Sequence, residues 1–332
     1  MDQFTKGDIN LVAIGGGTGL ATLLSGLKSF VGNKIGDLSA IVAVTDDGGS
    51  SGRLRDELQM PPPGDIRNCM VALSEDSSLL SKLFRYRFEG EGDLAGHNFG
   101  NLFLAALSEV TGDFAEAVRL SSEILASKGH IYPATVSNVR IAARLKDGTI
   151  VRGETKVSKV GGKIERLYLE PEDCHPMPKA IAAIENADII TVGPGSLFTS
   201  LLPPLLVRGV SEAIAISSAV KVFVCNLMTQ PGETDGMTSR RHLEIVREYA
   251  PNLQFDYIII NNRPITERQA ELYHEEGAEQ IGVHGSIEET VIEGTEIIYT
   301  NLLDDGDWVR HHPKRLARSV LDCLGRKQPN VN

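Results

Sequence analysis

Two glycine-rich segments of the chain have the residue types and the spacing of phosphate-binding turns. Each follows a short apolar run typical of a parallel strand, at residues 10–14 and 188–192, and each precedes a segment with helical spacing. A glycine turn lets the backbone approach a ligand, and the start of a helix directs free N–H groups at an anion. The pair therefore predicts a phosphate or diphosphate at the carboxyl ends of the strands. The candidate contacts are Gly15, Gly16, Gly17, Thr18, Gly19, Gly193, Pro194, Gly195 and Ser196.

A third polar loop follows the apolar run 38–44. It begins with Asp46 and Asp47 and continues with Ser50, Ser51 and Arg53. In a dinucleotide-binding fold, a carboxylate at this place accepts hydrogen bonds from a ribose. Two adjacent carboxylates could instead hold a divalent cation, such as Mg²⁺ bridging a diphosphate, and the residue types do not separate these roles. Arg53 is a candidate partner for an anion.

Polar side chains also flank apolar segments at three other places. Helix capping explains part of the first two clusters, but the paired amides that follow His97 suit a base edge or sugar hydroxyls. The third cluster follows the strand expected at 220–225, at its carboxyl end. These clusters add the candidate contacts Asp65, Asn68, Asn98, Asn101, Asn226 and Thr229.

The residues of a catalytic centre are harder to identify. The sequence has no HExxH motif and no Walker lysine motif. The histidines at the C-terminal end of the chain are typical of surface or terminal positions: His274, His284, His311 and His312. The sequence therefore indicates a binding site more clearly than it indicates a reaction.

The composition limits the classes of partner. The net charge is -11, which gives no general attraction for nucleic acid or anionic lipid. No apolar run approaches the roughly 20 residues that span a membrane, and the N-terminus has no apolar signal region. The four cysteines are far apart in the sequence, which fits a reducing compartment. We expect a cytoplasmic protein without nucleic-acid binding or membrane insertion.

The elements that must position these residues alternate between strand and helix. This order predicts a three-layer α/β/α, Rossmann-like fold with a mostly parallel sheet and a small antiparallel β insertion. Residues 1–130 and 172–332 form the two halves of one α/β domain, each with a phosphate loop, and residues 131–171 form the antiparallel unit. In that unit we expect strands at 134–145, 150–157 and 164–169.

Taken together, these motifs resemble those of the bacterial gluconeogenesis factor family. The two glycine segments and residues 45–53, 63–68 and 98–101 occur in the same order, and the resemblance covers nearly the whole chain. That family is related to the CofD-type 2-phospho-L-lactate transferases. The resemblance implies a Rossmann-like fold, a cytoplasmic location and binding of UDP-sugars or NAD. It also implies a role in cell shape and cell-wall synthesis during growth on gluconeogenic carbon sources.

Two functions follow as expectations. In the first, the chain is a binding protein that holds the diphosphate of a nucleotide-sugar or NAD between the two glycine segments, with a cell-wall-related protein and a second copy as candidate partners. In the second, it is a Mg²⁺-dependent diphospho-nucleotide transferase of the 2-phospho-L-lactate type, with the metal at Asp46 and Asp47.

Overall fold

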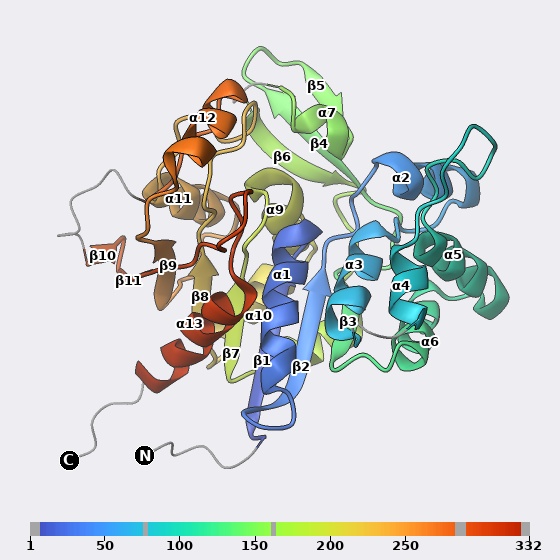
Figure 1. Cartoon of the computed structure of the whole chain (residues 1–332), viewed down its shortest axis with the longest axis horizontal. Helices are drawn as coiled ribbons and strands as arrows, with labels where there is room; N and C mark the ends of the chain where they lie inside the picture. Colours follow the sequence, from blue (N-terminus) through green and yellow to red (C-terminus); the bar gives the residue numbers. More distant parts are fainter. Residues whose placement is uncertain (1–6, 76–78, 161–163, 283–289, 327–332) are drawn as a thin grey trace.

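The main sheet of the computed structural model, which describes residues 7–75, 79–160, 164–282 and 290–326, has the strand order β10-β11-β9-β8-β7-β1-β2-β3 (Figure 1). All neighbouring strands are parallel except β10 and β11. The carboxyl ends of the parallel strands therefore share one edge. The strands are β1 (Ile9–Gly15), β2 (Ile35–Val42), β3 (His130–Pro133), β7 (Ile189–Val192), β8 (Val220–Val224), β9 (Tyr257–Asn261), β10 (Val291–Ile292) and β11 (Thr295–Thr300).

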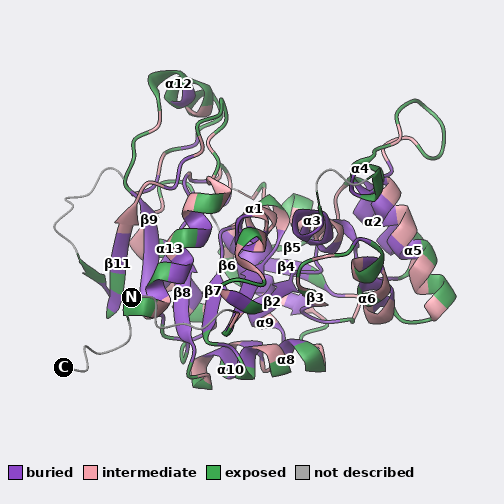
Figure 2. Ribbon diagram, turned by 60° about the horizontal axis from the view of Figure 1, so that its bottom comes forward, coloured by how far each residue is buried: buried purple, intermediate pink, exposed green. Residues whose placement is uncertain are grey.

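The central strands are apolar and buried because helices cover both faces of the sheet. All residues of β7, β8 and β9 are buried, as expected for a parallel sheet between two helical layers (Figure 2). One layer contains α1 (Gly17–Leu27), α3 (Gly64–Leu73) and α13 (Pro313–Arg326), and the other contains α8 (Pro178–Glu185), α9 (Leu202–Leu206) and α10 (Val210–Ile216). This arrangement confirms the predicted three-layer α/β fold.

The remaining helices lie beyond the two ends of the sheet or above its carboxyl edge (Figure 1). They are α2 (Gly49–Leu58), α4 (Leu79–Arg85), α5 (Phe99–Thr111), α6 (Phe114–Ile124), α11 (Ser239–Tyr249) and α12 (Glu267–Glu275), with the short 3-10 helix η1 (Lys28–Phe30) after α1. Within the described ranges, no single helix is long and apolar enough to cross a membrane. One pair of helices bent by 79° at its break, Leu197–Leu206 with Val210–Ile216, meets the length and composition test together.

A separate three-stranded antiparallel sheet has the order β5-β4-β6, with β4 (Arg140–Leu145), β5 (Ile150–Arg152) and β6 (Ile164–Glu170). It confirms the predicted β insertion, but two strand predictions were wrong in extent. The strand expected at 134–145 begins only at Arg140. The strand expected at 150–157 ends at Arg152, because Gly153 takes a left-handed φ of 95° and starts the helical turn α7 (Glu154–Val157).

Strand β3 lies outside this antiparallel sheet although its sequence falls in the range 131–171. It pairs in parallel with β2, with Ser39 opposite His130, and forms the edge of the main sheet. The antiparallel sheet accordingly starts later in the chain than the change in sequence pattern near Ile131 indicates.

Candidate functional site

A cleft of about 740 Å³ lies at the carboxyl ends of β1, β7 and β8. This volume is typical of small-molecule sites. The structure brings nine of the sequence-predicted contacts to its walls: Gly16, Gly17, Thr18, Gly19, Pro194, Gly195, Ser196, Asn226 and Thr229. Two loops that are about 175 residues apart in the sequence therefore form one concave surface, because β1 and β7 are neighbours in the sheet.

The two glycine loops pack directly against each other. A Cβ atom on Gly19 would lie 2.4 Å from the Pro194 carbonyl oxygen, so this approach requires glycine. The Gly195 N–H donates to Asn226 Oδ1 at 3.1 Å, which ties the second loop to the end of β8. The Thr229 hydroxyl accepts a 2.8 Å hydrogen bond from the Glu279 N–H and holds the outer wall of the cleft.

A carboxylate of the protein itself occupies the start of helix α1. The Gly17 N–H donates to Asp65 Oδ2 at 2.8 Å, and Asp65 comes from the first turn of α3. Burial and the charge of Asp46 raise the pKa of Asp65 to about 6, although hydrogen bonds from Gly17 and Asn68 oppose the shift. Asp46, Asp65 and Asn68 thus lie together behind the first loop.

A second carboxylate occupies the equivalent place in the second loop. The π-helix η2 (Leu197–Leu201) follows Ser196, and Glu233 Oε1 accepts hydrogen bonds from the Ser196 hydroxyl and, at 3.1 Å, from the Phe198 N–H. Glu233 is only 2% exposed. Burial raises the pKa of Glu233, and these hydrogen bonds limit the rise.

The antiparallel sheet contributes a third acid to the cleft through α7. Asp47 Oδ1 accepts from the Thr155 N–H at 2.9 Å and from the Thr155 hydroxyl at 2.7 Å, which fixes the start of α7. Glu154, the first residue of α7, lines the cleft. Burial and the charges of Asp65 and Asp46 raise the pKa of Glu154 to about 9, so this side chain is a neutral hydrogen-bond donor at pH 7.

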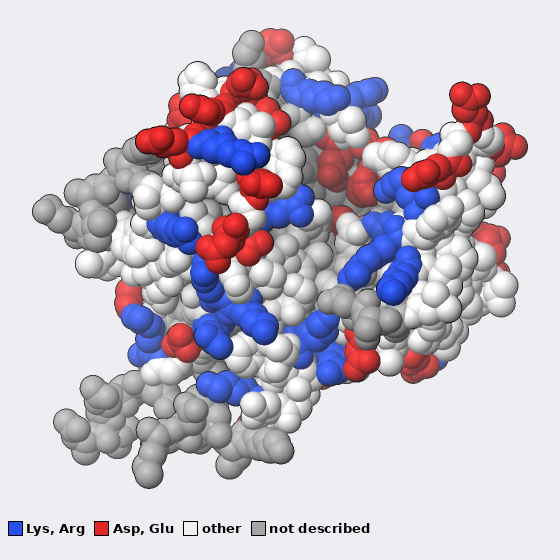
Figure 3. Space-filling view, viewed as in Figure 1, with Lys and Arg blue, Asp and Glu red and all other residues white. Residues whose placement is uncertain are grey.

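Acidic side chains are also visible on the surface around this site. Figure 3 shows Asp and Glu side chains in the recess between α2 and the antiparallel sheet, and others gathered over α12. Lys159 is a cation among the residues that line the cleft. Anion binding here must therefore rest on backbone N–H groups and neutral donors more than on a surplus of positive charge.

The comparisons with known proteins show the family of the chain. The family described as 2-phospho-L-lactate transferase CofD matches residues 11–303. A putative gluconeogenesis factor of Aquifex aeolicus is 46% identical over 320 residues, which cover 95% of this chain and 97% of that protein. The gluconeogenesis factor of Bacillus subtilis is 42% identical over 315 residues, covering 95% and 98%. The chain belongs to the gluconeogenesis factor family, within the wider CofD family.

A solved structure of the gluconeogenesis factor fold supports the same assignment. The crystal structure of a UPF0052 family member from Bacillus halodurans matches with a TM-score of 0.89 and 43% sequence identity, and covers 94% of this chain and 99% of that one. The two molecules therefore share the main sheet and its covering helices over nearly their whole length.

Several predicted contacts of this chain lie away from the cleft, in a buried network between α2 and α5. Asn98 caps α5 by accepting from the Asn101 N–H at 3.2 Å, and its own N–H donates to Ser50 Oγ at 3.2 Å. Asn101 donates to Ser51 Oγ at 3.4 Å. Arg53 donates to the Ala95 carbonyl at 2.7 Å. The network joins two helices, and a ligand role for these residues stays a prediction.

The predicted Mg²⁺ donors do not form a metal site by themselves. The Asp47 carboxylate is engaged at the start of α7, and Asp46 Oδ1 accepts from the Gly48 N–H at 2.9 Å. Within residues 7–75, 79–160, 164–282 and 290–326, no three His, Cys, Asp or Glu side chains are arranged to hold a metal ion. Mg²⁺ is usually bound by one or two carboxylates together with the phosphates of a ligand, so a Mg²⁺ role of Asp46 and Asp47 stays a prediction.

The structure adds functional candidates that the sequence reasoning missed: Glu154, Gln230, Glu233 and His311, all of which line the cleft. Gln230 and Glu233 lie in the loop after β8, so their position could have identified them. His311 has no such signal, because it comes from the segment before α13, where it is half-buried and lines the cleft. Exposed His274 agrees with the expected surface position, and His284 lies outside the described residues.

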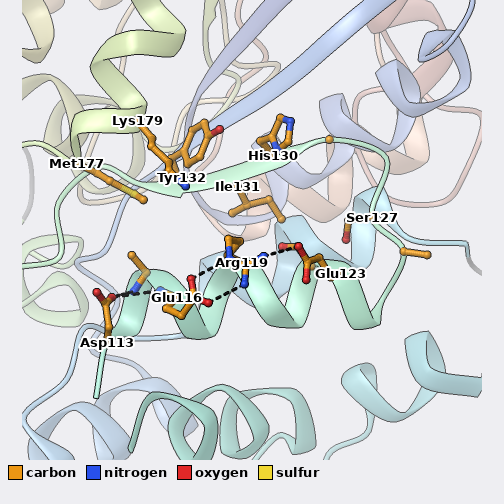
Figure 4. A pocket seen from close by; sticks show the side chains of 14 residues that line it. Asp113, Glu116, Arg119, Glu123, Ser127, His130, Ile131, Tyr132, Met177 and Lys179 are labelled. Carbon is orange, nitrogen blue, oxygen red and sulfur yellow. Dashed lines mark hydrogen bonds and ion pairs between the residues drawn. The ribbon is translucent and has the colours of Figure 1, made fainter. Parts of the chain in front are cut away.

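A second cavity, of about 530 Å³, lies between α6 and β3 (Figure 4). Its charged groups bind one another: Arg119 donates to Glu116 at 2.6 Å and also pairs with Glu123. Asp113 accepts from two N–H groups of α6 and caps that helix. No sequence-predicted contact lines this cavity, so we place the candidate site in the cleft between the glycine loops.

Proposed function

We propose that this gluconeogenesis factor binds a nucleotide-sugar or a dinucleotide, such as a UDP-sugar or NAD, with the diphosphate between the two glycine loops. The observation that carries the proposal is the convergence of both loops on one cleft at the carboxyl ends of β1 and β7. In α/β folds, this crevice is the usual place for a phosphorylated ligand. Gly17 and Gly195 line this cleft without side chains, so a ligand can approach the backbone of both loops closely.

The donors around the diphosphate are mostly neutral. The Thr18 side chain is exposed at the mouth of the cleft and can donate its hydroxyl, and Glu154 can donate its carboxyl proton. Lys159 supplies a positive charge at the same wall. A ligand that carries its own Mg²⁺ would meet less repulsion from Asp65 and Glu233 than a bare diphosphate.

The biological role is proposed from the family. The relatives are named gluconeogenesis factors, and we propose that this chain acts in the cytoplasm in cell shape and cell-wall synthesis during gluconeogenic growth. Ligand occupancy of the cleft would then report the supply of nucleotide-linked sugar or NAD to a cell-wall-related protein partner.

Calorimetric titration tests the proposal directly. UDP-N-acetylglucosamine, NAD and GDP are each titrated into the protein with and without Mg²⁺. We expect a dissociation constant in the micromolar range for one of them, which corresponds to about 8 kcal/mol of binding free energy. Affinities no tighter than millimolar for all three would refute the proposal.

A charged substitution then locates the diphosphate. Thr18→Glu places a carboxylate at the mouth of the cleft without disturbing the buried core, and we expect the affinity to fall by tenfold or more, about 1.4 kcal/mol or above. The matched control is Ser29→Glu, which adds the same charge at the opposite end of α1. Equal losses in both variants would mean that net charge, and not this loop, governs binding.

A second function is favoured by one observation, the match to the 2-phospho-L-lactate transferase family over most of the chain. In that case the protein transfers a phospholactyl group from a guanosine diphospho-lactate donor to a hydroxyl of a deazaflavin in the presence of Mg²⁺. The diphosphate bond breaks, a phosphodiester forms on the acceptor and GMP is the leaving group. Incubation with both compounds, followed by chromatography, tests this function. Formation of the phospholactyl deazaflavin would establish it, and the absence of product would leave the binding function.

A further inference from the structure

Two buried polar atoms at the cleft lack a hydrogen-bond partner. They are Gln230 Oε1 and His311 Nε2, which find no partner within the part of the chain that the structure describes. Both residues line the same cleft as the glycine loops. A buried acceptor without a partner costs about 1–3 kcal/mol, so such an atom calls for a partner such as an ordered water, an ion or a ligand.

Gln230 is held in place by its own loop. Its backbone N–H donates to the Thr234 hydroxyl at 2.8 Å, and its carbonyl accepts from the Glu233 and Thr234 N–H groups. The residue therefore sits on the same short turn as Glu233, which fixes the second glycine loop. Its backbone is therefore fixed beside that loop, and its side-chain oxygen is a buried acceptor at the cleft.

The tautomer of His311 follows from its other contact. The ring bonds the backbone carbonyl of Cys225 at the end of β8, and because Nε2 has no partner, that bond comes from Nδ1. Since a carbonyl only accepts, Nδ1 carries the proton and Nε2 presents a lone pair. Burial lowers the pKa of His311 to about 4, so the ring stays neutral at pH 7.

We infer that Gln230 Oε1 and His311 Nε2 form the subsite that reads the heterocycle of the bound nucleotide through its N–H donors. This inference rests on the proposed function and deepens it. The diphosphate lies at the glycine loops, and the heterocycle extends toward β8 and the segment before α13, where both acceptors lie. An N–H group of a base or a carboxamide satisfies them, whereas a heterocycle with only acceptors at that edge leaves them unpaired and is rejected.

Methylated or substituted ligands test the subsite on the intact protein. Three pairs are titrated: UDP against 3-methyl-UDP, GDP against 1-methyl-GDP, and NAD against its analogue with a carboxylate in place of the carboxamide. In each pair the second compound lacks an N–H donor. For the pair whose heterocycle binds here, we expect the second compound to bind at least tenfold more weakly than the first. This factor corresponds to the free-energy cost of one unpaired buried group. The affected pair identifies the heterocycle.

Variants assign the effect to the two acceptors. Gln230→Met and His311→Phe keep the side-chain volume but remove the acceptor, and we expect the affected pair to differ by less than about threefold in each. His311→Gln, which restores an acceptor and a donor, should recover part of the difference. Gln254→Met, on an exposed glutamine outside the cleft, is the control and should behave like the wild type. Thermal unfolding checks that each variant is folded.

Titration with ribose 5-diphosphate, which has no base, helps to distinguish a failure of the proposed function from a failure of the subsite. If the wild type binds no nucleotide at all, the proposed function fails and the subsite fails with it. If the wild type binds nucleotides but no pair differs, the subsite alone is refuted. It is also refuted if the variants lose affinity for ribose 5-diphosphate as strongly as for the nucleotides, because the side chains would then only support the walls of the cleft.

Discussion

The two glycine loops have the same local chemistry, and each precedes the positive end of a helix. They differ in how a carboxylate of the protein neutralises that helix end. In each, a carboxylate from a distant segment accepts hydrogen bonds at the start of the following helix: Asp65 at Gly17 and Glu233 at Phe198. Glu233 is 2% exposed and also bonds the Ser196 hydroxyl. Asp65 accepts from one loop N–H and lies beside the like charge of Asp46.

This difference indicates separate tasks for the loops. Glu233 replaces an external anion and fixes the second loop as a rigid wall. Asp65 is held less favourably, because desolvation and repulsion from Asp46 both oppose its charge. The first loop, with exposed Thr18, is therefore the one at which a ligand can compete with the protein's own carboxylate.

Removing Glu233 should give the largest effect. Glu233→Ala leaves the Phe198 N–H and the Ser196 hydroxyl without their acceptor in a buried place, and we expect the free energy of unfolding to fall by about 3 kcal/mol. Chemical denaturation measures it. Glu276→Ala, at an exposed glutamate that also lines the cleft, is the control and should change stability by less than about 0.5 kcal/mol. Similar values for both variants would remove Glu233 from its role in the second loop.

Neutralising Asp65 should have a smaller, pH-dependent effect. The folded pKa of about 6 lies above the ordinary value of 3.8, so the protein pays for the charge increasingly as the pH rises from about 4 to 6. Asp65→Asn keeps an acceptor for the Gly17 N–H without the charge. We expect it to be more stable than the wild type by roughly 1–2 kcal/mol at pH 8 and equally stable at pH 4.

Denaturation curves at both pH values decide this point. A variant that is less stable than the wild type at pH 8 would show that attraction between the Asp65 charge and the start of α1 outweighs burial and repulsion. The two loops would then be neutralised in the same way, and the contrast between them would disappear.

The smallest effect concerns the cause of the raised pKa of Asp65, which contacts the first loop. Asp46→Asn removes the nearest like charge while keeping an acceptor for the Gly48 N–H. We expect the pKa of Asp65 to fall below 6 and to stay above 3.8, because burial remains the larger cause. Titration of the Asp65 carboxyl carbon by NMR measures it. An unchanged pKa would assign the whole shift to burial.

Most of the fold could be predicted from the sequence, because its signals are local. The apolar runs before Gly15 and Gly193 and the helical spacing after them predict two strand–turn–helix units, and both form. The failed strand prediction has a non-local cause as well. The β-branched stretch at 150–157 indicates a strand, but Asp47 caps a helical turn there. The residues of the stretch itself do not indicate that a carboxylate from another loop binds them.

The candidate site was predictable only in part. Residues that directly follow strands, such as Asn226 and Thr229, reach the cleft because strand order places them there. Asn98 and Asn101 have equally suitable side chains but lie in the network between α2 and α5. Side-chain type alone does not distinguish an amide that faces a cleft from one that joins two helices.

The sequence by itself determined the alternating fold, the family and the two glycine turns, since each depends on residues close together in the chain. Only the tertiary structure decided which side chains contact those turns. Glu233 and His311 line the cleft, and Asp65 contacts the first loop from behind, each from a segment outside the two loops. Burial shifts the pKa of all three groups, and the charge of Asp46 adds to the shift of Asp65. Electrostatic interactions act through space, so the character of this site arises from packing and not from the order of residues.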